Sequence, residues 1–306
     1  MLQQCPPVFI VGSPRSGTTL LAGLLDGTPW GSPFETHFIP KYAAAAARAN
    51  LDDRRAFTDL ARLILRERPI AQHRLSISSD ELYDSLPSRD YASLVDAIGR
   101  ACGRQRGAAS WGDKTPHYIN DVGLLHALFP RAKMIYVVRD GRDVALSLLD
   151  KPWGPASVYG CALKWRDENR LQPILDTLRA HHLLHDLRYE DLLKAPVAAL
   201  TSLYEFLDQD VPLDEVIRRA GSIRRDNCGG WQRRLAPAQI ALFEQVAGQT
   251  LVRFGYPVTY QPRAVALPTR LAWRAQDAAK HAVNLFQMNV VDTLRIRFFG
   301  MEPFGQ

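Results

Sequence analysis

Short, continuous apolar segments alternate along the chain with segments of helical pattern. Val8–Val11 (VFIV) and Lys133–Val138 (KMIYVV) are almost wholly apolar, and Leu183–Tyr189 is a third strand-like segment. Such runs are typical of strands buried on both faces of a parallel sheet. Helix-like segments follow them, at Thr19–Leu25, Val144–Leu149 and Glu190–Leu193. The alternation predicts an α/β fold with a parallel β-sheet flanked by helices.

Residues 42–103 interrupt this alternation with a helical stretch. Ala43–Ala47 strongly favours a helix, and Ser78 with Glu81 matches a capping box. We expect Ser88 to cap the helix that follows. The stretch is interpreted as a helical cap insertion over the sheet, on the side of the substrate.

The segment after Pro262 is basic and amphipathic, and it contains several aromatic residues: Trp273, Phe286, Phe298 and Phe299. We expect these aromatic side chains to pack on the domain, with a homodimer contact or a membrane surface as the alternatives. The predicted organisation is one domain over residues 1–260, with the cap at 42–103 and a C-terminal helical extension over 261–306.

The composition narrows the class of protein. With 306 residues, 46% of them hydrophobic, the chain can bury a full core. The net charge of +6 suits an anionic ligand, but no nucleic-acid-binding motif is present. No apolar run approaches the roughly 20 residues of a membrane span, and no signal-peptide pattern opens the chain. The four cysteines are too widely spaced for a zinc site. We therefore expect a cytoplasmic protein without a transmembrane segment.

The segment Gly12–Thr19 (GSPRSGTT) has the spacing of a phosphate-binding loop between a strand and a helix. The backbone N–H groups of such a loop bind anions. The usual P-loop has a lysine where this chain has Thr18. That lysine acts together with magnesium in ATP and GTP chemistry. Its replacement argues against a kinase or ATPase, and Arg15 provides a cation in the loop instead.

A second phosphate-binding pattern follows the strand Lys133–Val138. Arg139 leaves this strand at the carboxyl edge of the predicted sheet, where ligands of open α/β sheets bind. An arginine can hold a phosphate through two parallel hydrogen bonds. Arg142 and Asp143, in contrast, are expected to form ion pairs on the surface.

Both motifs together resemble those of the sulfotransferase superfamily, whose donor is 3′-phosphoadenylyl sulfate (PAPS). VGSPRSGTTLL is similar to the family's 5′-phosphosulfate loop, and IYVVRDGRDVALSL (135–148) is similar to its 3′-phosphate motif. The resemblance implies that Arg139 and Ser147 bind the 3′-phosphate. It also implies that the loop binds the phosphosulfate through Arg15, Ser16, Gly17, Thr18 and Thr19.

The resemblance extends to further donor contacts. LRYEDLL (187–193) is similar to the strand whose tyrosine lies near the adenine, which is Tyr189 here. RRDNCGGW (224–231) resembles the late loop that closes on the 3′-phosphate and base. The resemblance implies that this loop contacts the donor through Arg224, Arg225 and Trp231. It also implies a phosphate contact at Lys151, four residues after Ser147.

Sulfuryl transfer requires a base for the acceptor hydroxyl, stabilisation of charge on the transferred group, and in-line alignment. SPFETHFIPK (32–41) resembles the segment with the catalytic glutamate of tyrosylprotein sulfotransferases, which implies Glu35 as the base, with His37 as the rival. WGDKTPHY (111–118) implies Lys114 as the stabilising cation, shared with Arg15. Asp113 is expected to accept hydrogen bonds in a local turn.

The sequence thus predicts a PAPS-dependent sulfotransferase that releases PAP and uses no metal ion. The acceptor carries a hydroxyl group or an amine, and a small molecule, a carbohydrate, a lipid and a peptide tyrosine all remain open. The alternatives are a P-loop kinase and a non-catalytic nucleotide-binding protein. No nucleic acid is expected as a partner.

Overall fold

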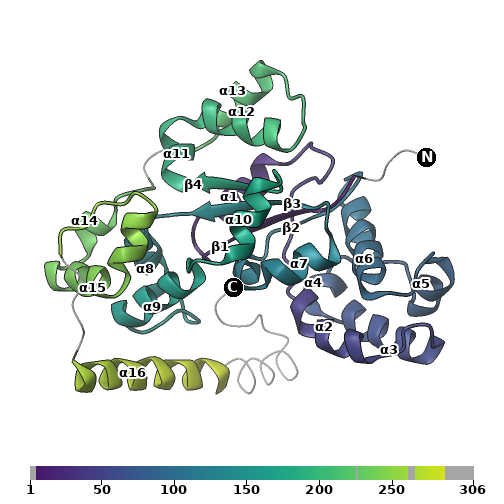
Figure 1. The fold of residues 1–306 in the computed structure, drawn as a ribbon, viewed down its shortest axis with the longest axis horizontal. Helices are drawn as coiled ribbons and strands as arrows, with labels where there is room; N and C mark the ends of the chain where they lie inside the picture. The colour runs from purple at the N-terminus through teal and green to yellow at the C-terminus, as the bar shows by residue number, and fades with distance from the viewer. Residues whose placement is uncertain (1–4, 225–226, 261–265, 287–306) are drawn as a thin grey trace, which may run out of the picture. The chain divides into compact units, whose positions relative to one another are not determined.

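The protein has a four-stranded sheet with the strand order β2-β1-β3-β4 (Figure 1). A computed structural model describes residues 5–224, 227–260 and 266–286. β1 pairs in parallel with β2 and with β3, with Phe9 opposite Asp113 and Gly12 opposite Val137. The strands are β1 (Val8–Gly12), β2 (Gly112–Asp113), β3 (Lys133–Val138) and β4 (Leu184–Arg188). The predicted α/β fold with a parallel sheet is confirmed.

The helices that follow three of these strands begin one to three residues earlier than the apolar pattern indicates. They are α1 (Thr18–Leu24), α8 (Gly141–Leu149) and α11 (Tyr189–Lys194). The start of α8 has a clear cause, because the carboxylate of Asp140 accepts a hydrogen bond from the backbone N–H of Arg142 at 2.9 Å. An acidic N-cap satisfies N–H groups that have no partner within the helix.

Two compact units make up the chain. The first comprises Met1–Val137 and Leu171–Ile223, and the second comprises Val138–Arg170 and Arg224–Gln306. The phosphate loop, Glu35 and Lys114 belong to the first unit. Arg139 and the late loop at 224–231 belong to the second.

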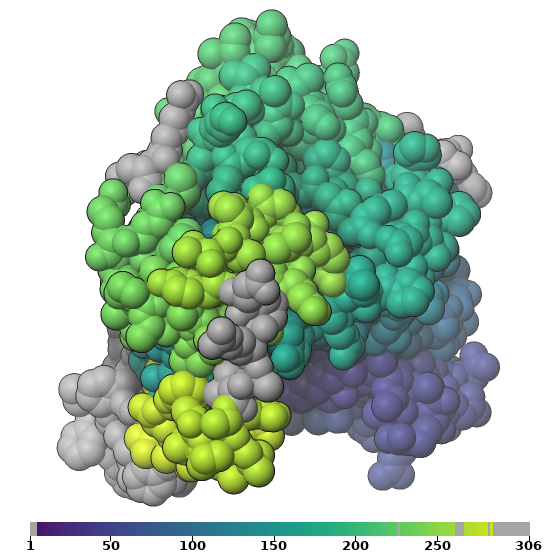
Figure 2. All heavy atoms as spheres, turned by 60° about the vertical axis from the view of Figure 1, so that its left-hand side comes forward, coloured from purple at the N-terminus to yellow at the C-terminus, as the bar shows by residue number. Residues whose placement is uncertain are grey.

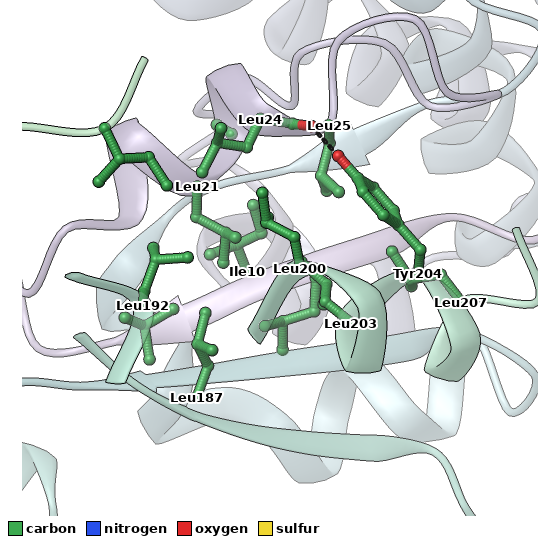
Figure 3. Close-up of a cluster of buried hydrophobic side chains, with 14 of the residues drawn as sticks. Ile10, Leu21, Leu24, Leu25, Leu187, Leu192, Leu200, Leu203, Tyr204 and Leu207 are labelled. Carbon is green, nitrogen blue, oxygen red and sulfur yellow. Dashed lines mark hydrogen bonds between the residues drawn. The ribbon is translucent and has the colours of Figure 1, made fainter. Parts of the chain in front are cut away.

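The core of the first unit packs helices onto the sheet (Figure 3). Ile10 and Leu21 are fully buried, as is Leu200 of α12 (Pro196–Phe206). Tyr204 donates a hydrogen bond from its hydroxyl to the carbonyl of Leu24 at 2.7 Å, which ties α12 to the end of α1. The hydroxyl is thereby satisfied inside an apolar cluster. This packing supports the strand and helix on either side of the phosphate loop.

The predicted insertion is helical, as expected, and its helices group together in Figure 1. Ser78 and Glu81 form the predicted capping box. The prediction for Ser88 is wrong, because α6 begins at Tyr91 and Asp90 is its N-cap, accepting from the N–H of Ser93 at 2.7 Å. The helices are α2 (Ile39–Arg48), α3 (Arg54–Leu65), α4 (Arg68–Ala71), α5 (Ser79–Ser85) and α6 (Tyr91–Gln105).

The remaining helices connect and cover these elements. In the first unit they are the 3₁₀ helix η1 (Pro116–Asp121), α7 (Val122–Leu128), α10 (Pro173–Ala180) and α13 (Leu213–Gly221). In the second they are α9 (Val158–Glu168), α14 (Trp231–Arg234), α15 (Pro237–Arg253) and α16 (Leu267–Phe286). Trp165 of α9 is fully buried, and a Cβ atom at Gly141 would lie 2.5 Å from its ring. Glycine is therefore required where α8 begins.

One face of α16 packs against the rest of the second unit. Trp273 stacks on Tyr159 with ring centroids 5.4 Å apart, and Asp277 accepts a hydrogen bond from the N–H of Ala156 at 2.8 Å. The opposite face is exposed along the yellow helix in Figure 2, as at Leu271. Packing on the domain, the first expectation for the tail, is thus observed for Trp273. The side chain of Phe286 lies outside the part of the chain that the structure describes, as do the whole residues Phe298 and Phe299. No helix in the described part of the chain is long and apolar enough to cross a membrane.

Candidate functional site

The phosphate loop leaves β1 with two residues in the left-handed region. Arg15 has φ 72° and Gly17, the N-cap of α1, has φ 96°. Left-handed residues in a loop turn successive N–H groups towards one point, which makes an anion-binding concavity. A non-glycine residue in this region is strained, and such strain clusters at functional sites. Arg15 and Thr19 are exposed, whereas Thr18 is buried.

Ser16 lies within this concavity. Its residue is fully buried, and among the described residues its Oγ atom has no hydrogen-bond partner. Buried hydroxyl groups nearly always have a partner, so each exception needs an explanation. An anion bound in the loop would provide the missing acceptor.

Both glycines of the loop are required by close packing. A Cβ atom at Gly12 would lie 2.3 Å from the carbonyl oxygen of Val137, and one at Gly17 would lie 2.3 Å from the ring of Tyr189. Tyr189 is 3% exposed. The predicted donor contact Tyr189 is therefore packed directly against the phosphate loop.

A parallel bridge between Phe34 and Asp113 brings the two predicted catalytic segments together. The N–H of Lys114 also donates to the carbonyl of Phe34 at 2.8 Å. As a result, the Nζ atom of Lys114 donates a hydrogen bond to Oε1 of Glu35. Nε2 of His37 lies 2.7 Å from Oε2 of the same carboxylate. The candidate base, its rival and the candidate cation form one cluster.

The cluster controls the protonation of Glu35. Partial burial raises its pKa, but the hydrogen bonds from His37 and Lys114 outweigh this effect and lower the pKa from 4.5 to about 2. Glu35 is therefore ionised at neutral pH. While Lys114 remains on it, however, the carboxylate is a weak base. A ligand anion that attracts Lys114 would increase the basicity of Glu35.

His37 has two further features. Its φ of 56° places a non-glycine residue in the left-handed region, which costs free energy and is typical of functional sites. Its ring also stacks on the ring of His117, with centroids 5.3 Å apart and an interplanar angle of 19°. The half-buried His117 thus belongs to the same cluster.

In the second unit, Arg139 and α8 hold the late loop. Arg139 follows β3, is 8% exposed, and donates from Nη2 to the carbonyl of Asn227 at 2.7 Å. The carboxylate of Asp143 accepts from the N–H of Gly229 at 2.6 Å and from that of Trp231 at 3.0 Å. The loop is anchored at three points within the unit.

The prediction that Arg142 and Asp143 form surface ion pairs is wrong. They are 1% and 4% exposed. Arg142 bonds to the carboxylates of Asp140 and Glu244 at 2.7 and 2.6 Å, and its guanidinium lies 3.7 Å from the ring centroid of Trp231. Charges can be buried when they are fully paired in this way. Sequence reasoning missed Glu244, although a single carboxylate beside Phe243 in an apolar segment was the available signal.

The other implied donor contacts are less enclosed. Ser147 and Lys151 are half-buried, at the end of α8 and just after it, and Trp231 is half-buried at the start of α14. Arg224 is exposed. Arg225 lies outside the described residues. Their donor contacts stay predictions.

A parallel α/β sheet whose first strand leads into an anion-binding loop defines a nucleotide-binding protein of the P-loop type. The profile of the Sulfotransferase family matches residues 6–214. The chain therefore belongs to the sulfotransferase family.

Protein-tyrosine sulfotransferase 1 of Danio rerio is 28% identical over 71% of this chain, which spans 59% of the length of that relative. Protein-tyrosine sulfotransferase A of Caenorhabditis elegans is 23% identical over 93% of the chain and 76% of its own length.

Among solved structures, the sulfotransferase domain of the Synechococcus PCC 7002 olefin synthase is 25% identical. It has a TM-score of 0.54 over 83% of this chain and 96% of that domain. The sulfotransferase domain from the curacin biosynthetic pathway, 20% identical, has a TM-score of 0.52 over 84% of this chain and 100% of that domain, which supports the fold.

Proposed function

We propose that this protein transfers a sulfuryl group from PAPS to an acceptor hydroxyl and releases PAP. The observation that carries the proposal is the hydrogen-bonded pair of Glu35 and Lys114, which supplies a base and a cation from two distant segments. Family membership supports the reaction class. The replacement of the P-loop lysine by Thr18 favours sulfuryl transfer without a metal ion over a kinase reaction.

The donor contacts are assigned separately for each unit. In the first unit, the loop from Arg15 to Thr19 would bind the phosphosulfate through its backbone N–H groups and the hydroxyl of Ser16. In the second unit, Arg139 and Ser147 would bind the 3′-phosphate. Further contacts to the nucleotide are assigned to Lys151, Tyr189, Arg224, Arg225 and Trp231.

The transfer itself uses the cluster around Glu35. A carboxylate oxygen of Glu35 accepts the proton of the acceptor hydroxyl as the acceptor oxygen forms its bond to sulfur. The bond between sulfur and the bridging phosphate oxygen breaks, and the leaving phosphate takes that electron pair. Lys114 and Arg15 stabilise the negative charge on the transferred and leaving oxygens. We assign the base to Glu35, and His37 orients its carboxylate from the other oxygen.

The first acceptor to test is a tyrosyl hydroxyl, because two relatives are named protein-tyrosine sulfotransferases. A small molecule, a carbohydrate and a lipid are the other outcomes. Three further expectations stay predictions. They are the single domain over 1–260 with its extension at 261–306, the cytoplasmic location, and a homodimer through the tail.

The test measures transfer of radioactive sulfate from labelled PAPS to a tyrosine peptide, an oligosaccharide, a hydroxylated lipid and a small phenol. In parallel, calorimetry measures binding of PAP without magnesium. We expect micromolar binding, loss of turnover in Glu35→Ala with PAP binding retained, and weakened PAP binding in Arg139→Ala. Magnesium-dependent binding of ATP without binding of PAP would contradict the proposal. Loss of turnover in His37→Ala but not in Glu35→Ala would move the base to His37.

A further inference from the structure

We propose that Asp113 is a positioning residue that holds Glu35 and Lys114 in register with each other. The inference rests on the proposed function of that pair. Asp113 itself faces neither the donor nor the acceptor in the proposed reaction. It acts through the backbone on both sides of the pair.

The carboxylate of Asp113 is fully buried at the end of β2. Oδ1 accepts from the N–H of Thr115 at 2.7 Å. Oδ2 accepts from the N–H of Thr36 at 2.9 Å and from the hydroxyl of Thr115 at 3.0 Å. A buried carboxylate is costly unless hydrogen bonds compensate it, and here three donors do so. The expected turn to Thr115 is present, but the contact with Thr36 extends far beyond a local turn.

The three donors flank the catalytic pair. Thr36 directly follows Glu35, and Thr115 directly follows Lys114. A single carboxylate thus joins two segments that the chain separates widely. The N–H of Lys114 donates to the carbonyl of Phe34, so the backbone on each side of Glu35 is held to the segment that carries Lys114.

Tyr118 adds a second link between these two segments, through contacts on both sides of His37. Its hydroxyl bonds to Oγ1 of Thr36 at 2.9 Å and accepts from the N–H of Ile39 at 3.0 Å. These contacts fix the ends of the strained turn at His37. Asp113 is the charged member of this network. Its loss would leave the N–H of Thr36 with Oγ1 of Thr115, at 3.1 Å, as the remaining acceptor.

The negative charge of Asp113 is costly at this buried position. Burial raises the pKa of Asp113 to about 6 against the opposing effect of its hydrogen bonds, so the ionised form is disfavoured relative to an exposed aspartate. A neutral residue would avoid this cost. An Asn side chain of the same shape, however, would direct an N–H group at one of the N–H donors of Thr36 or Thr115. At least one of the hydrogen bonds that Asp113 accepts would then be lost.

The decisive variants are Asp113→Asn and a matched control, Asp96→Asn. Asp96 is another partly enclosed aspartate of the first unit, which accepts from Trp111 at 2.8 Å and Arg100 at 2.7 Å. We expect Asp113→Asn to lower kcat about 100-fold, because small displacements of reacting groups have effects of this size. The Kd for PAP should stay within about twofold. Asp96→Asn should change neither value.

A second readout does not depend on turnover. The rate at which acetic anhydride acylates Lys114, followed by mass spectrometry, reports whether Glu35 still holds its ammonium group. Acylation should become several-fold faster in Asp113→Asn and in Glu35→Gln, and stay unchanged in Asp96→Asn. If Asp113→Asn does not fold, Thr115→Val is the second variant. It removes the hydroxyl that donates to Asp113 and accepts from the N–H of Thr36, and it should show a smaller increase.

The two hypotheses fail differently. If the unmodified protein transfers no sulfuryl group to any acceptor, the proposed function fails, and the acylation rates still decide the role of Asp113. Wild-type kcat and wild-type acylation in folded Asp113→Asn would overturn the inference while leaving the proposed function intact. Equal losses in Asp96→Asn would also overturn it, because they would indicate a general effect on stability.

Discussion

Lys114 donates a hydrogen bond from Nζ to Oε1 of Glu35, and the two residues are 79 positions apart in the chain. In this arrangement each group neutralises the other before substrates bind. A sulfonate at the phosphate loop would compete for Lys114, and its success would leave Glu35 free to accept a proton. Donor binding and activation of the base would then be one event.

The first prediction concerns Lys114→Met. Its kcat should fall by about 10²- to 10³-fold, the effect of removing one donor to a developing negative charge. The pKa of Glu35 should rise from about 2 towards 4.5, because a hydrogen bond that lowers it is gone. Single-turnover quench experiments and carboxyl NMR titration would measure the two effects. Undiminished turnover would show that Lys114 does not stabilise the transition state.

The second prediction concerns how the free energy of unfolding depends on pH. Since the pKa of Glu35 is about 2 in the folded state and near 4.5 in the unfolded chain, its ion pair stabilises the fold above about pH 4.5. This contribution is lost as the pH falls from 4.5 towards 2. Urea unfolding of the wild type and Glu35→Gln should therefore differ by a constant amount at neutral pH and converge in acid. The difference should be small, since Glu35 is 39% exposed and solvent screens it. A gap that does not close in acid would contradict the pairing.

The third prediction concerns the late loop. Asp143→Ala removes the acceptor for the N–H groups of Gly229 and Trp231, which should destabilise the protein by about 1–3 kcal/mol. Binding of PAP should weaken about tenfold, and binding of 5′-AMP much less, because the loop is proposed to contact the 3′-phosphate. Calorimetry with both nucleotides would measure this. The control is Asp150→Ala, whose exposed carboxylate contacts Arg234. Equal weakening for both nucleotides would argue against a role at the 3′-phosphate.

The fourth prediction compares two glycines of the phosphate loop and its helix. Gly17→Ala should abolish PAP binding, because Gly17 has φ 96° and a Cβ atom would overlap the ring of Tyr189. Gly23→Ala, in α1, meets nothing within 4 Å, and it should stabilise the helix by about 0.5–1 kcal/mol. Thermal unfolding and PAP titration would separate the two effects. Normal PAP binding in Gly17→Ala would remove this loop from the donor site.

Local features of this protein were predictable from the sequence because they depend on neighbouring residues. The apolar run of β1, the glycine spacing of the phosphate loop and the capping box at Ser78 each reflect conformations that a few adjacent residues determine. The resemblance of the short motifs also identified the family, and the profile match confirmed it.

Only the tertiary structure decided which distant groups meet. The bridge between Phe34 and Asp113 sets the register that pairs Glu35 with Lys114. The burial of Arg142 depends on Glu244, which approaches from another helix. Hydrophobic pattern specifies which side chains are buried, but the partner of a charged group depends on sheet register and helix packing. Those follow from the whole chain, and they bring Asp113 between the two predicted catalytic segments.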